Sequence, residues 1–170
     1  MTNLQKRRGI VVVSILVFGF LIHLAPRIIY LNTTGSVPVG LYLAIPGMNL
    51  RHGDLVVYDP PEKAKELVLA RNYGEDGKSD RAFLKRVGAL PGDIYGVVDD
   101  ILLVNGEKKG DVLKFDSAGN LMPTEDGFRM VRKGTFLPLG DKPNSLDGRY
   151  TGTVPLESIR TRVVPLITEW

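Results

Sequence analysis

The segment Phe83-Leu84-Lys85-Arg86-Val87-Gly88-Ala89-Leu90-Pro91-Gly92-Asp93 predicts a β-strand that runs into a tight turn. Side chains alternate between the two faces of a strand, so Phe83, Lys85 and Val87 are expected on one face. A lysine between two large apolar residues is a candidate for a buried amine with a lowered pKa, because desolvation disfavours the ammonium form. The same pattern also suits a lysine at a strand edge whose ammonium stays in water.

The sequence on both sides of this segment is also typical of β-structure. Apolar runs predict strands at residues 40–45, 53–58, 94–104 and 159–166. The strands of residues 94–104 are expected to break at Asp99-Asp100, Asn105-Gly106 predicts a hairpin turn, and one short helix is expected over residues 62–71. Residues 107–133 resemble an insertion of short strands and charged turns without identifiable chemistry. We therefore predict a mostly β fold, with antiparallel strands coiled into a barrel-like or two-sheet domain.

The composition narrows the class of protein. A chain of 170 residues is long enough for one domain with its own core. It contains no cysteine and two histidines, so neither a disulfide framework nor a cysteine-based zinc site is expected, and we predict no metal and no cofactor.

The charge distribution argues against a nucleic-acid partner. The chain has 22 basic and 19 acidic residues, but four of the basic residues and none of the acidic ones lie in residues 1–30. The remainder carries 18 basic and 19 acidic side chains, a net charge of −1. A binder of phosphate backbones would need a basic face in its folded part.

The N-terminal part predicts a membrane anchor. Lys6-Arg7-Arg8 precedes an apolar run of about 17 residues up to Ala25, near the lower limit for a helix that spans a bilayer. A cleaved signal peptide and a buried core helix are the alternatives, but the run lacks a good cleavage site and a polar face. We expect a cytoplasmic basic flank at residues 1–8, a transmembrane anchor at 9–26 and an extracytoplasmic domain at 27–170.

Directly after this run stands Asn32-Thr33-Thr34-Gly35-Ser36-Val37-Pro38-Val39-Gly40-Leu41-Tyr42. Pro38 fixes its own φ and disfavours helical backbone at Val37, so the Ser36 hydroxyl is expected on a stiffened turn. A plain turn into a strand explains the same residues. A third polar stretch, residues 141–152, places Ser145, Asp147 and Arg149 at alternate positions, which is also ordinary for a solvated loop.

Together, three motifs resemble the type I signal peptidases, which are membrane-bound serine proteases with a Ser–Lys dyad. The motifs are Thr34-x-Ser36-x-Pro38, the Phe83–Asp93 segment, and Gly140-Asp141-x-x-x-Ser145-x-Asp147-x-Arg149-Tyr150-x-Gly152. The resemblance is closest to conjugative-transfer peptidases of the TraF type, which mature a pilin. The signs of this are the compact length, the single anchor and a serine motif one residue shorter than that of the housekeeping enzymes.

The resemblance implies a role for each matched residue. Ser36 would be the nucleophile and Lys85 the general base, and the Thr34 hydroxyl and the Ser36 N–H would stabilise the oxyanion. Ser145 would orient the lysine. Asp147 and Arg149 would form an ion pair, in which Asp147 is either catalytic, as in the conjugation branch, or structural.

The implied function is a membrane-anchored serine endopeptidase that removes a signal or propeptide segment from an exported substrate. The favoured substrate is a conjugative pilin, which the enzyme would mature by hydrolysis or by ring closure. The expected location is the bacterial inner membrane, with the N-terminus in the cytoplasm and the catalytic domain in the periplasm, in contact with a transfer or secretion complex. Three alternatives stay open: a general signal peptidase I, a non-catalytic tethered assembly factor, and a self-cleaving regulator. The self-cleaving regulator would require a DNA-binding module, which residues 1–30 do not supply.

Overall fold

The computed structural model describes residues 10–17, 19–20, 28–73, 81–124 and 127–169. From residue 29 on, its helical elements are α2 (Glu62–Arg71), α3 (Gly148–Thr151) and the 3₁₀ turn η1 (Leu156–Ser158). The strands are β1 (Ile29–Asn32), β2 (Gly40–Ile45), β3 (Leu55–Tyr58), β4 (Phe83–Ala89), β5 (Ile94–Val98), β6 (Ile101–Val104), β7 (Glu107–Asp111), β8 (Gly127–Met130), β9 (Thr135–Leu139), β10 (Val154–Pro155) and β11 (Ile159–Thr168).

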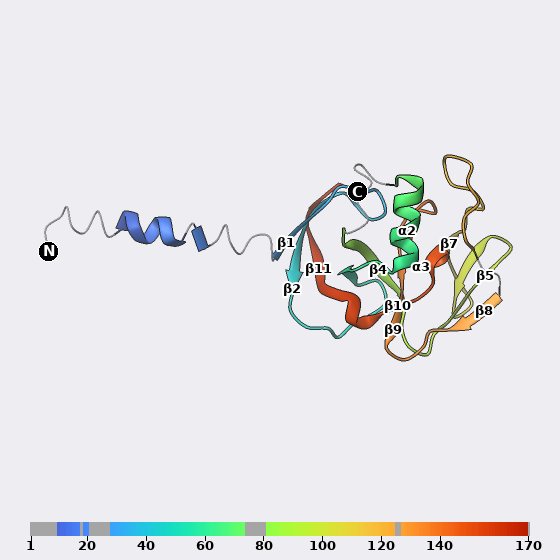
Figure 1. Cartoon of the computed structure of the whole chain (residues 1–170). Helices are drawn as coiled ribbons and strands as arrows, with labels where there is room; N and C mark the ends of the chain where they lie inside the picture. Colours follow the sequence, from blue (N-terminus) through green and yellow to red (C-terminus); the bar gives the residue numbers. More distant parts are fainter. Residues whose placement is uncertain (1–9, 18, 21–27, 74–80, 125–126, 170) are drawn as a thin grey trace, which may run out of the picture.

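The strands form two antiparallel sheets, which confirms the predicted mostly β, two-sheet architecture. The larger sheet has the order β1-β2-β11-β3-β4-β9-β10, and the smaller has the order β7-β6-β5-β8 (Figure 1). In the larger sheet β4 lies between β3 and β9, and Lys85 pairs directly with Val56 of β3. The lysine motif therefore lies inside the sheet rather than on an edge strand.

The smaller sheet contains the Asn105-Gly106 hairpin turn that the sequence predicts, and its strands break at Asp99-Asp100 as expected. Asp99 and Asp100 join β5 to β6 with positive φ angles of 50° and 61°, and Asn105 and Gly106 join β6 to β7 in the same region. Positive φ at both central residues gives the turn twist that two-residue hairpins need. One cluster of buried residues, which includes Tyr95, Leu102, Leu137 and Tyr150, joins this sheet to β9 and α3.

The expected helix over residues 62–71 is present as α2, and it ends at Asn72 in the left-handed conformation. The short helix α3 was not predicted from the sequence. Its first turn begins at Asp147, whose carboxylate accepts a hydrogen bond from the Arg149 backbone N–H. An aspartate at this position satisfies an N–H that the helix itself leaves unpaired.

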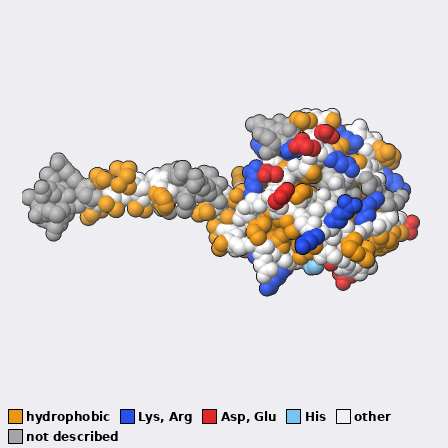
Figure 2. Space-filling view, turned by 60° about the horizontal axis from the view of Figure 1, so that its bottom comes forward, with side chains coloured by type: hydrophobic (Ala, Val, Ile, Leu, Met, Phe, Trp, Pro, Cys, Tyr) orange, Lys and Arg blue, Asp and Glu red, His pale blue; other side chains and the backbone are white. Residues whose placement is uncertain are grey.

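The expected transmembrane anchor, residues 9–26, lies partly outside the described residues. Its described residues, 10–17 and 19–20, are helical. Within the ranges that the structure describes, none of the helices has both the length and the apolar character to cross a bilayer. On the β domain, Figure 2 shows basic and acidic side chains on the same face, with hydrophobic ones between them.

Candidate active site

The loop that carries Ser36 is held by one buried side chain, Asn32 at the end of β1. Its carboxamide nitrogen donates to the carbonyls of Thr34, Val37 and Pro38 at 2.9, 3.1 and 3.0 Å. Asn32 is only 7% exposed, so these bonds are shielded from water. Ser36 is thus on an ordered turn, as the Gly-Ser-Val-Pro sequence predicts.

The hydroxyls of Thr34 and Ser36 lie 3.2 Å apart. Thr34 Oγ1 also lies 2.9 Å from Asn32 Oδ1, which can only accept a hydrogen bond. The single hydroxyl hydrogen of Thr34 therefore points to Asn32, and Ser36 is the donor in the contact between the two hydroxyls. For Thr34 to donate to an oxyanion, it must first release Asn32.

The backbone of Ser36 is fixed from the other side by Asp141, two residues after the end of β9. The Asp141 N–H donates to the Ser36 carbonyl at 2.6 Å. The Asp141 carboxylate in turn accepts two bonds from the Arg86 guanidinium, at 2.6 and 2.9 Å. Arg86 follows Lys85 on β4, so this chain of contacts links the lysine strand to the serine loop.

Lys85 is buried, with 6% of its surface exposed, and it does not lie at a solvated strand edge. Its Nζ lies 5.5 Å from the centroid of the Phe83 ring, on the shared face that the alternation predicts. Burial lowers the pKa of Lys85 from 10.5 to about 8, and the positive charge of Arg149 acts in the same direction, while Asp147 opposes it. With that pKa about a tenth of the lysine is neutral at pH 7, which is enough for a working base.

Asp147 and Arg149 form a fully buried ion pair, with an Nε–Oδ1 distance of 2.9 Å. The pair is anchored to Gly140, whose N–H donates to Asp147 at 2.7 Å and whose carbonyl accepts from Arg149 at 2.8 Å. Arg149 also donates to the Asp111 carbonyl. Burial raises the pKa of Asp147, and the charges of Arg149 and Lys85 and the backbone donors oppose that rise. These contacts support a structural role for Asp147. The negative charge of Asp147 acts on Lys85 by raising the pKa of the lysine.

Ser145 is 5% exposed, and among the described residues its hydroxyl has no hydrogen-bond partner. A Cβ added at Gly140 would lie 2.2 Å from Ser145 Oγ and 2.9 Å from the Ser36 carbonyl. Only glycine therefore fits at position 140, where the serine loop and the Ser145 loop meet.

One cavity of about 540 Å³ brings four of the predicted residues together: Thr34, Ser36, Lys85 and Ser145 all line it. Asp147 does not line this cavity, and Arg149 lines a second one of about 590 Å³. The candidate site thus has a hydroxyl on an ordered turn, a buried amine with a lowered pKa, and a buried hydroxyl without a partner. Among the described residues no cluster of histidine, aspartate and glutamate could hold a metal ion.

Several residues of the site were missed in the sequence. Asn32 could have been found from its position two residues before Thr34, where asparagine side chains commonly bond to the following backbone. Asp141 and Arg86 are 55 positions apart, and no local pattern signals their pairing. The segment 113–122, which the sequence suggested to be a featureless insertion, also lines the cavity of Ser36 and Lys85 through Leu113, Phe115, Asp116, Ser117 and Met122.

Comparison with known proteins agrees with the motifs. Residues 3–167 match the sequence profile of the family described as "Signal peptidase, peptidase S26". The plasmid transfer protein TraF of Escherichia coli is 32% identical over 149 residues, which cover 81% of this chain and 81% of that protein. Signal peptidase I of Leptolyngbya laminosa is 31% identical over 115 residues, 67% of this chain and 51% of that protein.

Among solved structures, a crystal structure of a signal peptidase I from Enterococcus faecalis V583 covers 70% of this chain and 100% of its own, with 20% identity and a TM-score of 0.42. The family match and the TraF similarity confirm the resemblance that the three motifs predict.

Proposed function

Because the chain belongs to the signal peptidase, peptidase S26, family of serine endopeptidases, we propose that it cleaves peptide bonds with Ser36 as the nucleophile and Lys85 as the general base. The observation that carries this proposal is the shared cavity. Ser36 lines it from the ordered serine loop, and Lys85 lines it from β4 as a buried amine with a pKa of about 8. A serine hydroxyl is a weak nucleophile until a neighbouring base removes its proton.

The chemistry follows from these positions. Lys85 Nζ takes the proton of the Ser36 hydroxyl as Oγ attacks the scissile carbonyl, and the proton then passes to the leaving amine. The Ser36 N–H, with the Thr34 hydroxyl once it has turned from Asn32, stabilises the negative oxygen of the tetrahedral intermediate. Attack of water on the resulting ester releases a hydrolysed product, and attack of the substrate's own amine releases a ring.

The proposed substrate is an exported protein with a signal or propeptide segment, and the TraF similarity favours a conjugative pilin. We place the catalytic domain on the periplasmic side of the bacterial inner membrane, anchored by residues 9–26. Exposed apolar side chains on β1 and β11, the two strands that flank β2, support a location close to the bilayer, because Leu31 and Ile167 are each 69% exposed. General processing of exported preproteins is the second candidate, favoured by the signal peptidase I similarity.

The test is mass spectrometry of a candidate pilin from cells that carry the wild-type chain, Ser36→Ala or Lys85→Ala. We expect a trimmed pilin only with the wild type, and a further loss of one water if the product is a ring. Ser158→Ala and Lys108→Ala are the matched controls. The Ser158 hydroxyl bonds to the Pro155 carbonyl, and Lys108 pairs with Asp111, both outside the cavity. If the Ser36→Ala or the Lys85→Ala variant reaches the membrane and the pilin is still fully trimmed, the proposed Ser36–Lys85 dyad is refuted.

A further inference from the structure

One basic residue of the active-site cavity, Lys142, is anchored directly beside the proposed nucleophile. Lys142 follows Asp141, whose backbone N–H donates to the Ser36 carbonyl at 2.6 Å. The carbonyl of Lys142 itself accepts from the Ser145 N–H at 3.1 Å, and both serines line the cavity. The backbone of Lys142 is therefore held between the serine loop and the Ser145 loop, although its side chain is long.

The side chain of Lys142 lies over Gly35, the residue before the nucleophile. A Cβ added at Gly35 would lie 3.2 Å from Lys142 Nζ and 3.9 Å from its Cε. Lys142 is exposed, and it lines the cavity that also contains Ser36 and Lys85. A second amine, distinct from the proposed base, thus faces the space in which the proposed substrate would bind.

The ammonium group of Lys142 is not neutralised by its neighbours. The adjacent acid, Asp141, uses both carboxylate oxygens to accept from the Arg86 guanidinium. Within the part of the chain that the structure describes, the Lys142 ammonium forms no ion pair and no hydrogen bond. A charged donor beside the serine loop is therefore available to a bound molecule.

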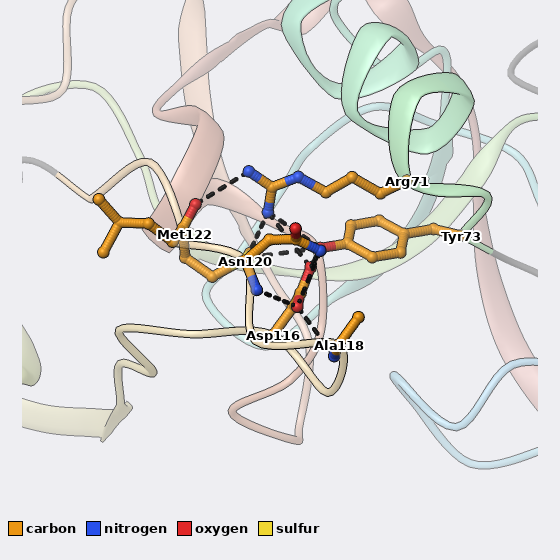
Figure 3. Close-up of polar contacts among 7 residues, drawn as sticks. Arg71, Tyr73, Asp116, Ala118, Asn120 and Met122 are labelled. Carbon is orange, nitrogen blue, oxygen red and sulfur yellow. Dashed lines mark hydrogen bonds and ion pairs between the residues drawn. The ribbon is translucent and has the colours of Figure 1, made fainter.

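Asp116, the one acid among the described residues that line the cavity, is already occupied. Its carboxylate accepts from the Tyr73 hydroxyl at 2.5 Å, from the Asn120 side chain at 2.9 Å and from Arg71 at 3.4 Å (Figure 3). The hydrogen bond from Tyr73, followed by those from Asn120, holds the pKa of the Asp116 carboxyl well below its usual range. Asp116 thus stays charged at neutral pH, with its charge opposed by Arg71.

The charged lining of the cavity is consequently basic. Arg81, Lys85 and Lys142 line it, against the single acid Asp116 among the described lining residues. A hollow lined mainly by charges of one sign attracts groups of the opposite sign, and it does so more strongly than an open surface because its walls exclude part of the water. The anions that an unmodified peptide carries are carboxylates.

We infer that Lys142 is a specificity-determining residue that binds a carboxylate of the substrate close to the cleaved bond. The carboxylate belongs to an acidic side chain or to the end of a peptide chain, since an ammonium binds both in the same way. Lys85 cannot take this role, because a general base must lose its charge in order to act. This inference rests on the proposed peptidase function.

The first experiment uses the full chain in detergent micelles and pairs of fluorogenic peptides that differ only in one charge. The peptides span the cleavage site of a candidate pilin, and each position beside the cleaved bond carries Glu in one peptide and Gln in its partner. A second set ends shortly after the cleaved bond, in a free carboxylate or in an amide. We expect the wild type to cleave the carboxylate member of one pair with a kcat/KM about fivefold higher, the effect of one well-placed ion pair. Lys142→Met, which removes the charge and keeps the length of the side chain, should reduce that ratio to less than about 1.5-fold through KM.

Charge reversal separates recognition by Lys142 from a structural effect. In Lys142→Glu the order should invert, so that Gln exceeds Glu, or the amide exceeds the free carboxylate. Lys133→Met is the matched control, because Lys133 is also an exposed lysine but does not line this cavity. Its ratio should equal that of the wild type. A wild type without a carboxylate preference in any pair, or a preference that persists in Lys142→Met, would overturn the inference.

A binding measurement separates this inference from the proposed function. Both members of each peptide pair are titrated into the Ser36→Ala chain and into the Ser36→Ala, Lys142→Met double variant, and binding is followed by fluorescence anisotropy. In the Ser36→Ala chain we expect the Kd of one carboxylate peptide to be about fivefold lower than that of its neutral partner, and in the double variant the two values should be equal. Equal Kd values in the Ser36→Ala chain, or no binding to it, would overturn the inference. A wild-type chain that cleaves none of the peptides would instead contradict the proposed function, and the Kd values would still test Lys142.

Discussion

The Asp141 backbone N–H donates a 2.6 Å hydrogen bond to the carbonyl of Ser36. Asp141 is itself held by two bonds from Arg86, the residue that follows Lys85 on β4. The strand that supplies the proposed base therefore also restrains the backbone of the proposed nucleophile. Because Lys85 and Arg86 are adjacent and point to opposite faces, one strand can perform both tasks.

Removal of the Arg86 side chain should therefore impair catalysis more than stability. The Arg86–Asp141 pair is about one-third exposed, and such pairs contribute about 0–1 kcal/mol to folding. In Arg86→Ala we expect kcat to fall by roughly ten- to a hundredfold, because a small displacement of the nucleophile is costly. Peptide cleavage and urea denaturation measure the two effects. Arg160→Ala breaks a comparable pair with Asp59 away from the cavity and should leave kcat unchanged. A similar loss of kcat in both variants would contradict this role of Arg86.

The activity should rise with pH and reach half its maximum near the pKa of Lys85, about 8. Only the neutral amine can accept the proton of Ser36, so kcat/KM should increase about tenfold per pH unit below that value and level off above it. The profile of kcat/KM against pH between 6 and 10 measures this in the free enzyme. A flat profile from pH 6 upward would show that another group acts as the base.

The same lowered pKa predicts how stability depends on pH. Between pH 8 and 10.5 an unfolded chain keeps a proton on Lys85 that the folded chain has lost. The unfolding free energy should thus increase as the pH rises through this range, by up to about 3 kcal/mol. Urea denaturation of the wild type and of Lys85→Met at pH 7.5 and 10 isolates the contribution of this residue, because the variant has no proton to lose. The prediction fails if both chains change equally.

Loss of the Asp147 carboxylate should destabilise the fold. It would leave the buried Arg149 guanidinium without its partner and the Gly140 N–H without an acceptor. Removal of one member of a buried pair costs about 3–5 kcal/mol, so Asp147→Ala should unfold at a much lower urea concentration. Asp59→Ala, which breaks a pair that is about half exposed, should cost less than about 1 kcal/mol. If Asp147→Ala were as stable as the wild type yet inactive, a catalytic role would be favoured instead.

A methyl group at position 140 should disturb the site by steric overlap. It would lie 2.2 Å from Ser145 Oγ and 2.9 Å from the Ser36 carbonyl, so Gly140→Ala should lose about 1–3 kcal/mol and most of its activity. Removal of the Ser145 side chain in the same background eliminates the closest overlap. The double variant Gly140→Ala, Ser145→Gly should therefore recover part of the stability in urea denaturation. If it recovers none, the overlap with Ser145 is not the cause of the loss.

The sequence alone determined the features that depend on neighbouring residues. Alternation along residues 83–87 placed Lys85 on the apolar face with Phe83, and the structure places the two in contact. The Asn105-Gly106 turn and the bounds of α2 were equally local, because backbone conformation and periodicity are set within a few residues. The three motifs also identified the family, since their residue types and order can be recognised without knowledge of the fold.

The tertiary structure decided what depends on distant contacts. Only the pairing of β3, β4 and β9 buries Lys85 on a strand interior to the sheet, and this burial is the largest cause of its lowered pKa. The Arg86–Asp141 clamp and the Tyr73–Asp116 network join residues 55 and 43 positions apart, and no periodicity along the chain encodes such pairs. The physical reason is that desolvation and hydrogen-bond partners are properties of the assembled sheet and loops, whereas the sequence specifies directly only the backbone preferences of each segment.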